Sequence, residues 1–189
     1  MRIIAGRLGG LRLVAPKGQA TRPTGDRVKE ALFAILGPLG GEGSRALDLY
    51  AGSGALGLEA LSRGAEQIVF VEEARAALEA LRANVTQVHA EASCQIVSKS
   101  VERALSTAAA APWGTEPFTL ILADPPYADV TSGKAVRAFG YLVKQRLLAP
   151  GGRFVLEHAS ADVSPAIEGL APPDTRRYGD TSLAFYELP

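Results

Sequence analysis

Short apolar segments alternate with amphipathic segments along most of the chain. Five segments have the composition of buried strands, namely residues 46–49, 68–71, 95–97, 118–123 and 154–156. Helical spacing of apolar residues predicts helices near residues 55–63, 74–86, 100–110 and 133–148. Continuous apolar strands that alternate with helices are typical of a parallel sheet covered on both faces. The pattern therefore predicts a doubly wound α/β fold.

The two ends of the chain depart from this alternation. Residues 1–14 alternate loosely around Gly9-Gly10, which predicts a small β-hairpin. Asp26 can cap a helix that follows this hairpin. At the other end, residues 175–178 and 183–187 flank a turn and predict a closing antiparallel hairpin.

Charge is distributed unevenly, although the chain has 20 basic and 20 acidic residues. Residues 1–36 contain seven basic and two acidic groups, a net charge of +5, so the remainder carries −5. This asymmetry indicates a basic arm on an acidic body, although a solvated strand pair with scattered arginines gives the same count. We therefore divide the chain into a basic N-terminal extension, residues 1–40, and a main domain, residues 41–189.

Composition excludes several classes of protein. The longest uncharged stretch, residues 104–115, has 12 residues, whereas a membrane-spanning helix needs about 20 apolar residues. Cys94 is the only cysteine, so the chain cannot form an intrachain disulfide. His89 and His158 are too isolated in sequence to suggest a metal site. We expect a soluble, cytoplasmic, monomeric protein that needs no metal.

The first chemical signal follows the first predicted core strand. Gly52, Gly54 and Gly57 form a G-x-G-x-x-G pattern, and Glu72 lies 20 residues beyond Gly52 at the end of the next strand. This spacing is typical of a dinucleotide-binding turn in which the acid holds ribose hydroxyls. Asp48 changes the interpretation, because a carboxylate at the strand end would repel a pyrophosphate. The same carboxylate suits S-adenosylmethionine, which carries an ammonium and a sulfonium but no phosphate.

The second signal, Asp124-Pro125-Pro126-Tyr127, directly follows the apolar segment 118–123. The carboxyl ends of parallel strands line the ligand crevice, so this tetrapeptide should lie beside the glycine-rich turn. The prolines have no N–H, which leaves carbonyl oxygens and Asp124 as hydrogen-bond acceptors. Tyr127 adds a flat aromatic ring. The combination suits a planar base that carries an exocyclic amine.

Together, the two motifs resemble those of the class I amino-methyltransferases, which use S-adenosylmethionine and act on exocyclic nitrogens. Further segments resemble the bacterial 16S rRNA guanine-N2 methyltransferases, namely Arg2-Ile-Ile-Ala-Gly6, Arg22-Pro-Thr24, Arg27-Val-Lys-Glu30-Ala-Leu-Phe33 and Tyr178-Gly-Asp180-Thr181. The resemblance covers essentially the whole chain. It implies a Rossmann-like class I methyltransferase sheet with a C-terminal antiparallel hairpin and a small N-terminal extension of hairpin and helix.

The resemblance also implies roles for individual residues. Asp124 and the Pro125 carbonyl would accept hydrogens of the guanine N2 amine, which attacks the sulfonium methyl group in line. Pro126 would stiffen the turn, and Tyr127 would stack on a guanine taken out of its stack. The expected contacts to S-adenosylmethionine are Asp48, Tyr50, Gly52, Ser53, Gly54, Gly57, Glu72 and Ser100. Many relatives have an acid after the third strand, where this chain has Ser98-Lys-Ser100, so adenine contact is expected from Ser100 or the backbone.

The basic extension is expected to bind RNA, because arginine supplies both charge and a stacking plane. The candidate contacts are Arg2, Arg7, Arg12, Lys17, Arg22 and Arg27. The expected partner is 16S rRNA, either naked or in the assembling 30S subunit. Two alternatives stay open: another amino-methyltransferase, acting on DNA adenine N6 or a protein glutamine, and a non-catalytic RNA-binding protein on the same fold.

Two further residues carry weaker expectations. Trp113, beside Pro112 and Gly114, predicts a surface loop in which an exposed indole could meet RNA. Glu157 ends a predicted core strand on the crevice side, and it is either structural or part of the pocket.

Overall fold

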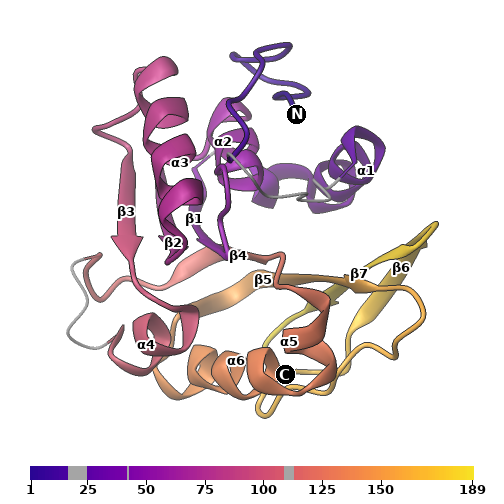
Figure 1. The fold of residues 1–189 in the computed structure, drawn as a ribbon. Coiled ribbons are helices and arrows are strands. Elements are labelled where there is room, and N and C mark those ends of the chain that lie inside the picture. The colour runs from indigo at the N-terminus through magenta and orange to yellow at the C-terminus, as the bar shows by residue number, and fades with distance from the viewer. Residues whose placement is uncertain (17–24, 42, 109–112) are drawn as a thin grey trace.

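A seven-stranded β-sheet forms the centre of the molecule (Figure 1). The computed structural model describes residues 1–16, 25–41, 43–108 and 113–189. The strands are β1 (Arg45–Leu49), β2 (Gln67–Glu72), β3 (Cys94–Ser98), β4 (Phe118–Ala123), β5 (Leu148–Ala159), β6 (Asp174–Tyr178) and β7 (Thr181–Tyr186). Their order across the sheet is β3-β2-β1-β4-β5-β7-β6. Strands β1 to β5 run parallel, whereas β7 runs antiparallel to both β5 and β6.

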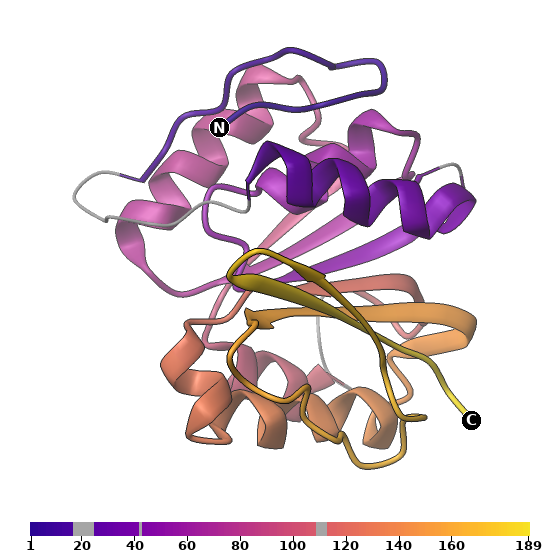
Figure 2. The ribbon, with the colours of Figure 1, turned by 90° about the vertical axis from the view of Figure 1, so that its right-hand side faces the viewer.

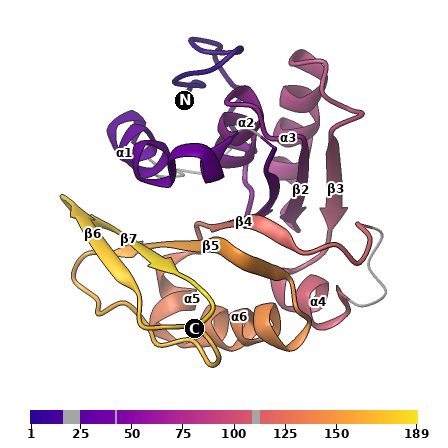
Figure 3. The same ribbon diagram turned by 180° about the vertical axis from the view of Figure 1, so that it is seen from behind.

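Helices cover both faces of this sheet (Figures 1 and 3). One layer contains α1 (Asp26–Leu36), which continues into the 3-10 helix η1 (Gly37–Gly40), α2 (Ala55–Ser62) and α3 (Arg75–Gln87). The other layer contains α4 (Val101–Ser106), α5 (Tyr127–Thr131) and α6 (Lys134–Lys144). Each layer buries its own apolar cluster against the sheet. The arrangement confirms the predicted doubly wound α/β fold with a closing antiparallel hairpin.

Strand β1 shows how the sheet serves both layers. Leu47 and Leu49 are buried in the cluster that contains residues of α4 and α6, whereas Ala46 belongs to the cluster with residues of α1 to α3. Successive side chains of a strand point to opposite faces, so Asp48 points to the same face as Ala46. The sequence pattern therefore places one carboxylate in an otherwise apolar strand, on the face that α1 to α3 cover.

Residues 1–16 form a hairpin-like arm over the layer of α2 and α3 (Figure 2). Arg2 and Arg12 form an isolated antiparallel bridge, and the backbone N–H of Ile3 donates to the Leu11 carbonyl at 2.9 Å. The side chains of Ile3 and Leu13 are buried among residues of α1 to α3. The predicted N-terminal hairpin is thus a short paired segment whose apolar side chains attach it to the main domain.

Several element boundaries differ from the sequence-based expectation. Helix α6 ends at Lys144, because Leu147 already pairs with the neighbouring strand: its carbonyl accepts the N–H of Phe118 at 2.7 Å. Strand β5 consequently has 12 residues, and its register with β4 shifts between Phe118 and Leu120. The five-residue helix α5 is not predicted by the apolar pattern. The helix expected over residues 100–110 ends at Ser106, and part of its expected range lies outside the described residues.

Trp113 contradicts its predicted place in a surface loop. Its side chain is only 5% exposed and lies edge-on to Phe118, with 6.4 Å between ring centroids. Burial of a large apolar ring outweighs the turn signal of the flanking residues. The indole therefore stabilises the core, and the expectation that it could meet RNA is wrong.

Candidate functional site

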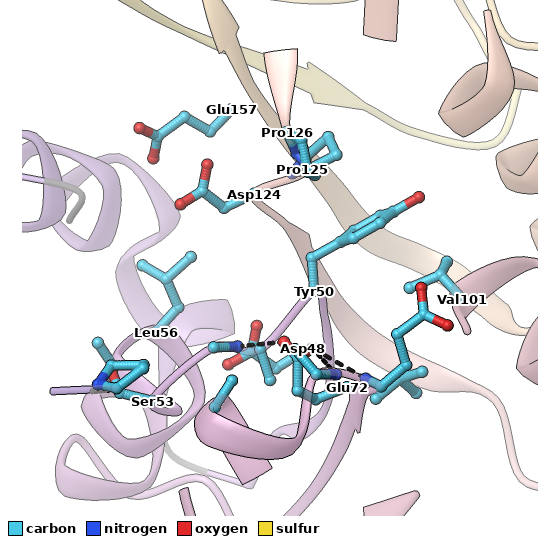
Figure 4. Close-up of a pocket in the computed structure, with 18 of the residues that line it drawn as sticks. Asp48, Tyr50, Ser53, Leu56, Glu72, Val101, Asp124, Pro125, Pro126 and Glu157 are labelled. Atoms are coloured by element: carbon cyan, nitrogen blue, oxygen red, sulfur yellow. Dashed lines mark hydrogen bonds between the residues drawn. The ribbon is translucent and has the colours of Figure 1, made fainter. Parts of the chain in front are cut away.

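A cavity of about 690 Å³ opens at the carboxyl ends of the central strands. It lies where the strand order reverses, between β1 and β4, which is the usual ligand position in open α/β sheets. Its size is in the range that small-molecule ligands occupy. Its lining comes from the end of β1 and the glycine-rich loop, the end of β2, the starts of α3 and α4, and residues between Asp124 and Asp129. Glu157 of β5 and the arm residues Met1 and Pro16 complete it (Figure 4).

The glycine-rich loop needs its glycines for two different reasons. Gly52 and Gly54 adopt φ angles of 57° and 81°, in the left-handed region that favours glycine. Gly57 instead allows close packing, since a Cβ there would lie 2.4 Å from a ring carbon of Phe70. Gly52 lines the cavity, whereas Gly54 and Gly57 shape the turn behind it. The loop can therefore bring its backbone close to a ligand while α2 packs tightly on β2.

Asp48 is buried beneath this loop, with 2% of the residue exposed. Its Oδ2 accepts a hydrogen bond of 2.8 Å from the backbone N–H of Gly57. Burial raises the pKa of the carboxyl to about 8, and this effect exceeds the opposing influence of the Gly57 hydrogen bond. Asp48 also lines the cavity. It thus joins β1 to the start of α2 and presents an acidic group to any ligand.

Glu72, at the end of β2, is held in place by three backbone groups (Figure 4). Its Oε2 accepts from the N–H of Gly52 at 2.8 Å, and its Oε1 accepts from the N–H groups of Glu73 and Ala74, each at 2.8 Å. A carboxylate offers about four lone-pair sites. One acceptor site therefore remains for a ligand hydroxyl in the cavity.

Tyr50 occupies a strained position directly after β1. Its φ of 58° is in the left-handed region, which is uncommon for a residue with a bulky side chain. The ring is half-buried, lines the cavity and meets Phe139 edge-on at 6.5 Å. Burial raises the pKa of the phenol, with a smaller contribution from Asp129, so the hydroxyl stays protonated and can donate. Such outliers persist where the surrounding structure enforces them, often at ligand sites.

The Asp124-Pro125-Pro126-Tyr127 segment lies on the opposite side of the cavity. Asp124 directly follows β4, whose last residue, Ala123, pairs with Leu49 of β1. Pro126 precedes α5, and its carbonyl accepts from the N–H of Asp129 at 2.8 Å. The Tyr127 hydroxyl lies 3.5 Å from Oγ1 of Thr181 in β7. All four residues of the motif line the cavity, so the structure brings the two sequence motifs together.

Glu157 of β5 is a further acid in this wall. The β4–β5 register pairs Ala123 with Leu156, so Asp124 and Glu157 follow at neighbouring positions on adjacent strands. Glu157 is only 5% exposed, yet it lines the cavity. Figure 4 shows the two carboxylates pointing in the same direction. Of the two roles that the sequence left open for Glu157, the structure supports the pocket position.

The cavity is strongly acidic. Its described lining residues include Asp48, Glu72, Glu73, Asp124, Asp129 and Glu157, against Lys99 as the one basic residue. Like charges at short range repel strongly in a partly buried site. This wall is therefore suited to a cationic ligand and unsuited to a pyrophosphate.

Ser53 and Ser100, two expected cofactor contacts, differ in their position relative to the cavity. Ser53 lines the cavity, and its Oγ lies 3.0 Å from the Met1 sulfur. Ser100 instead caps α4, where its Oγ accepts from the N–H of Arg103 at 3.3 Å. The cavity-lining residues on either side of it are Lys99 and Val101, and Ser100 is not among those that line the described cavity. The residues on either side of Ser100 therefore line the cavity, and its contact to adenine stays a prediction.

The described candidate RNA contacts lie on the surface. Arg2, Arg7, Arg12 and Arg27 are exposed, and Arg2 pairs with Asp26 through an Nε–Oδ2 distance of 2.9 Å. The other two candidates, Lys17 and Arg22, lie outside the described residues.

A buried ion pair fixes the extension, and sequence reasoning missed it. Lys29 of α1 is 1% exposed, and its Nζ lies 3.5 Å from Oε2 of the fully buried Glu59 in α2. Glu59 also accepts from the backbone N–H groups of Ile4 and Ala5 at 2.6 and 3.0 Å. Burial lowers the pKa of Lys29, although Glu59 opposes this shift. The position of Lys29 in the sequence of an amphipathic helix did not indicate that its charge is buried.

The arm also reaches the cavity. Asn84 of α3 accepts from the N–H of Val14 at 2.7 Å and donates to the carbonyls of Val14 and Ser53. Met1 and Pro16 line the cavity beside the glycine-rich loop. The N-terminal segment is thus a wall of the site, a role that its loose alternation and charge did not suggest.

The described residues contain neither a helix that could span a membrane nor a cluster of metal-binding side chains. No helix in the described part of the chain is long and apolar enough to cross a membrane. Within the same residues, His, Cys, Asp and Glu side chains form no group of three suited to a metal ion.

The chain is similar to known proteins over nearly its whole length. The family model "Conserved hypothetical protein 95" matches residues 1–187. The chain is 36% identical over 189 residues to "Putative rRNA methyltransferase YlbH" of Bacillus subtilis, covering 99% of this chain and 98% of that protein. It is 33% identical over 158 residues to "Ribosomal RNA small subunit methyltransferase D" of Haemophilus influenzae, covering 83% and 78% of the two chains.

Solved structures agree with this assignment. The "Putative methyltransferase yhhF" of Escherichia coli superposes with a TM-score of 0.83 at 29% identity, covering 100% of this chain and 97% of that one. A more distant structure, SMU.776 complexed with SAH, shares the fold with a TM-score of 0.64 at 15% identity over 86% of this chain and 49% of that one. The chain therefore belongs to the "Conserved hypothetical protein 95" family, that of the small-subunit rRNA methyltransferases D, and has the class I methyltransferase fold.

Proposed function

We propose that this protein transfers a methyl group from S-adenosylmethionine to the exocyclic N2 of a guanine in 16S rRNA. The observation that carries the proposal is the position of Asp124-Pro125-Pro126-Tyr127 on one wall of an acidic cavity whose other wall is the glycine-rich loop. The relatives named as small-subunit rRNA methyltransferases support the class of RNA substrate.

The cavity fits S-adenosylmethionine on chemical grounds. Glu72, with one acceptor site left, is suited to hold a ribose hydroxyl. The other acids of the lining, Glu73, Asp124, Asp129 and Glu157, suit the ammonium and sulfonium charges, and Asp48 offers a carboxyl oxygen as an acceptor. Gly52 lets the loop backbone approach closely, and Tyr50 offers a protonated hydroxyl as a donor. When bound, S-adenosylmethionine supplies an electrophilic methyl group on a cationic sulfur.

The opposite wall is suited to hold the acceptor amine. The Asp124 carboxylate and the Pro125 carbonyl accept the two N2 hydrogens, which turns the nitrogen lone pair toward the reacting methyl group. Tyr127 stacks on the base, and the prolines keep the segment stiff without adding donors that would compete for the same acceptors. As the nitrogen gains the methyl group, it gives up one proton, which Asp124 is positioned to receive. Positioning and exclusion of water then account for most of the rate.

The N-terminal arm is suited to bring RNA to this wall. Asp48 points to the α1–α3 face, and Asp124 lies two register steps further along the same face, because Asp48 pairs with Leu122. The arm, with its exposed Arg7 and Arg12, covers part of this face. An RNA strand held by the arm would therefore present its base from the side on which the acids lie.

Product analysis tests this proposal. Purified protein and S-adenosylmethionine with an isotopically labelled methyl group are incubated with naked 16S rRNA, 30S subunits from a strain lacking the gene, or duplex DNA. Nucleosides are then analysed by mass spectrometry. We expect label in N2-methylguanosine from one of the two ribosomal substrates. Label in N6-methyladenosine or in protein, or no transfer to any acceptor, would contradict the proposal.

A further inference from the structure

The second acid of the substrate wall lies outside both sequence motifs. Glu157 belongs to β5, and its register position is next to Asp124 on the adjacent strand. Both side chains point to the α1–α3 face, because Leu122 and Val155, two residues earlier on each strand, are buried in the cluster of that face. The cavity therefore contains two neighbouring carboxylates where a base would lie.

Two neighbouring acceptors match guanine and no other base with an exocyclic amine. On the Watson–Crick edge of guanine, the N2 amine stands beside N1–H, so two donors are adjacent. In adenine and cytosine the ring nitrogen beside the amine carries a lone pair instead. In a glutamine side chain the neighbouring group is a carbonyl, again an acceptor. A carboxylate beside the amine site would face a donor only in guanine.

We infer that Glu157 selects guanine by accepting a hydrogen bond from N1–H while Asp124 holds the N2 amine. The inference rests on the proposed function and extends it from the reaction to the choice of base. The main cause is repulsion: a carboxylate opposite the lone pair of adenine N1 or cytosine N3 leaves two buried acceptors facing each other, which disfavours binding. Glu157 is buried, with 5% of the residue exposed, and its backbone is held between β4 and β7, where it pairs with Leu183, so the strand fixes where its side chain begins.

Two RNA substrates distinguish selection of guanine by Glu157 from a purely structural role of this residue. Once the methylated guanine has been located, RNA is prepared with guanine or 2-aminopurine at that position. 2-Aminopurine keeps the N2 amine but has a lone pair at N1. We expect wild-type kcat/KM to be about 10- to 100-fold lower on 2-aminopurine RNA, the range for an unpaired buried hydrogen-bonding group.

The variant Glu157→Gln should reduce this preference by at least tenfold, because its amide NH2 can donate to N1 of 2-aminopurine. Glu157→Asp keeps the charge but shortens the reach, so it should lose turnover on guanine without gaining on 2-aminopurine. Glu79→Gln, a change on the exposed face of α3 at a side chain that pairs with Arg75, serves as the matched control and should keep both wild-type values. Affinity for S-adenosylhomocysteine, measured by calorimetry, verifies that each variant retains the folded cavity.

The outcomes are distinct. An equal loss on both RNAs in Glu157→Gln, with the preference unchanged, means that Glu157 only supports the wall and overturns the inference. A wild-type protein that modifies no guanine overturns the proposed function and the inference with it. If the wild-type protein modifies guanine but accepts 2-aminopurine equally well, the proposed function stands. Only the inference that Glu157 selects guanine is then overturned.

Discussion

The two walls of the cavity are built by different means. On the β1–β2 side, a backbone N–H of the loop and one of the first turn of α2 hold the carboxyl groups of Glu72 and Asp48. On the β4–β5 side, the acids stand on adjacent strands, and the turn beside them contains two prolines that donate no backbone hydrogen bond. The first wall is therefore shaped by local loop geometry, and the second by the register between strands. We expect changes on the first wall to affect folding and cofactor binding, and changes on the second to affect the base.

On the first wall, a single added methyl group at Gly57 should lower the stability of the protein. In Gly57→Ala, the new Cβ would lie 2.4 and 2.9 Å from ring atoms of Phe70, which is fully buried. Overpacking of this kind typically lowers the free energy of unfolding by about 1–3 kcal/mol. Urea denaturation measures the loss.

A glycine on the other layer provides the control. Gly140, inside α6, has nothing within 4 Å of an added Cβ. Gly140→Ala should therefore raise stability by about 0.5–1 kcal/mol through helix propensity. Equal effects at the two positions would show that the packing of α2 on β2 is looser than described.

On the second wall, loss of the aromatic ring of Tyr127 should reduce the affinity for RNA. Tyr127→Ala should weaken RNA binding by about 1–3 kcal/mol, the value for stacking of one base on a side chain. Tyr127→Phe should keep most of the affinity, since the hydroxyl makes only a long contact of 3.5 Å to Thr181. Binding assays at fixed salt distinguish the two variants. If Ala and Phe lose affinity equally, the hydroxyl and not the ring face carries the contact.

Asp48 should make the stability of the loop wall depend on pH. Its pKa is raised from 3.8 to about 8 in the folded protein, so between these values the folded state binds more protons than the unfolded state. This group therefore lowers the free energy of unfolding as pH rises from about 4 to 8, by at most about 1.4 kcal/mol per pH unit.

The variant Asp48→Asn isolates this dependence. Asparagine keeps an acceptor for the Gly57 N–H but cannot ionise. The stability difference between variant and wild type should therefore increase from pH 5 to pH 8 in urea denaturation. A difference that stays constant with pH would mean that Asp48 titrates normally.

How far the sequence predicts the site also differs between the walls. Glycine spacing and an acid at a strand end are local signals, so Gly52, Gly57 and Glu72 could be identified from the chain alone. The neighbourhood of Asp124 and Glu157 depends on the β4–β5 register, which includes a shift at Phe118 that no local pattern indicates.

Burial was the other property that local patterns predicted poorly. Lys29 counts as a surface charge in an amphipathic helix, but packing of α1 against α2 places it beside Glu59. Trp113 has the neighbours of a loop residue, but its ring is buried in the core against Phe118. In both cases tertiary contacts, which involve residues far apart in sequence, determine the outcome.

The smallest expected effect concerns the exposed arginines of the N-terminal arm, which do not line the cavity. Replacing Arg7 and Arg12 by Gln should weaken RNA binding modestly and reduce the slope of log affinity against log salt by about 1.4, at about 0.7 per phosphate contact on single strands. Affinity for S-adenosylmethionine should stay unchanged, because neither side chain lines the described cavity. An unchanged salt slope would mean that the arm serves only as a wall of the site.

The central claim is that the two walls divide cofactor binding from chemistry, and a crossed comparison of two isosteric variants tests it most directly. Glu72→Gln and Asp124→Asn are each measured for S-adenosylmethionine affinity by calorimetry and for methyl transfer to 16S rRNA at saturating cofactor. We predict that Glu72→Gln weakens cofactor binding by about tenfold or more, the value of a hydrogen bond to a charged group, with much of the saturated rate retained. Asp124→Asn should bind the cofactor within a small factor of wild type and lose at least 100-fold in rate. Loss of cofactor affinity in Asp124→Asn, or near-normal turnover by it, would contradict the account.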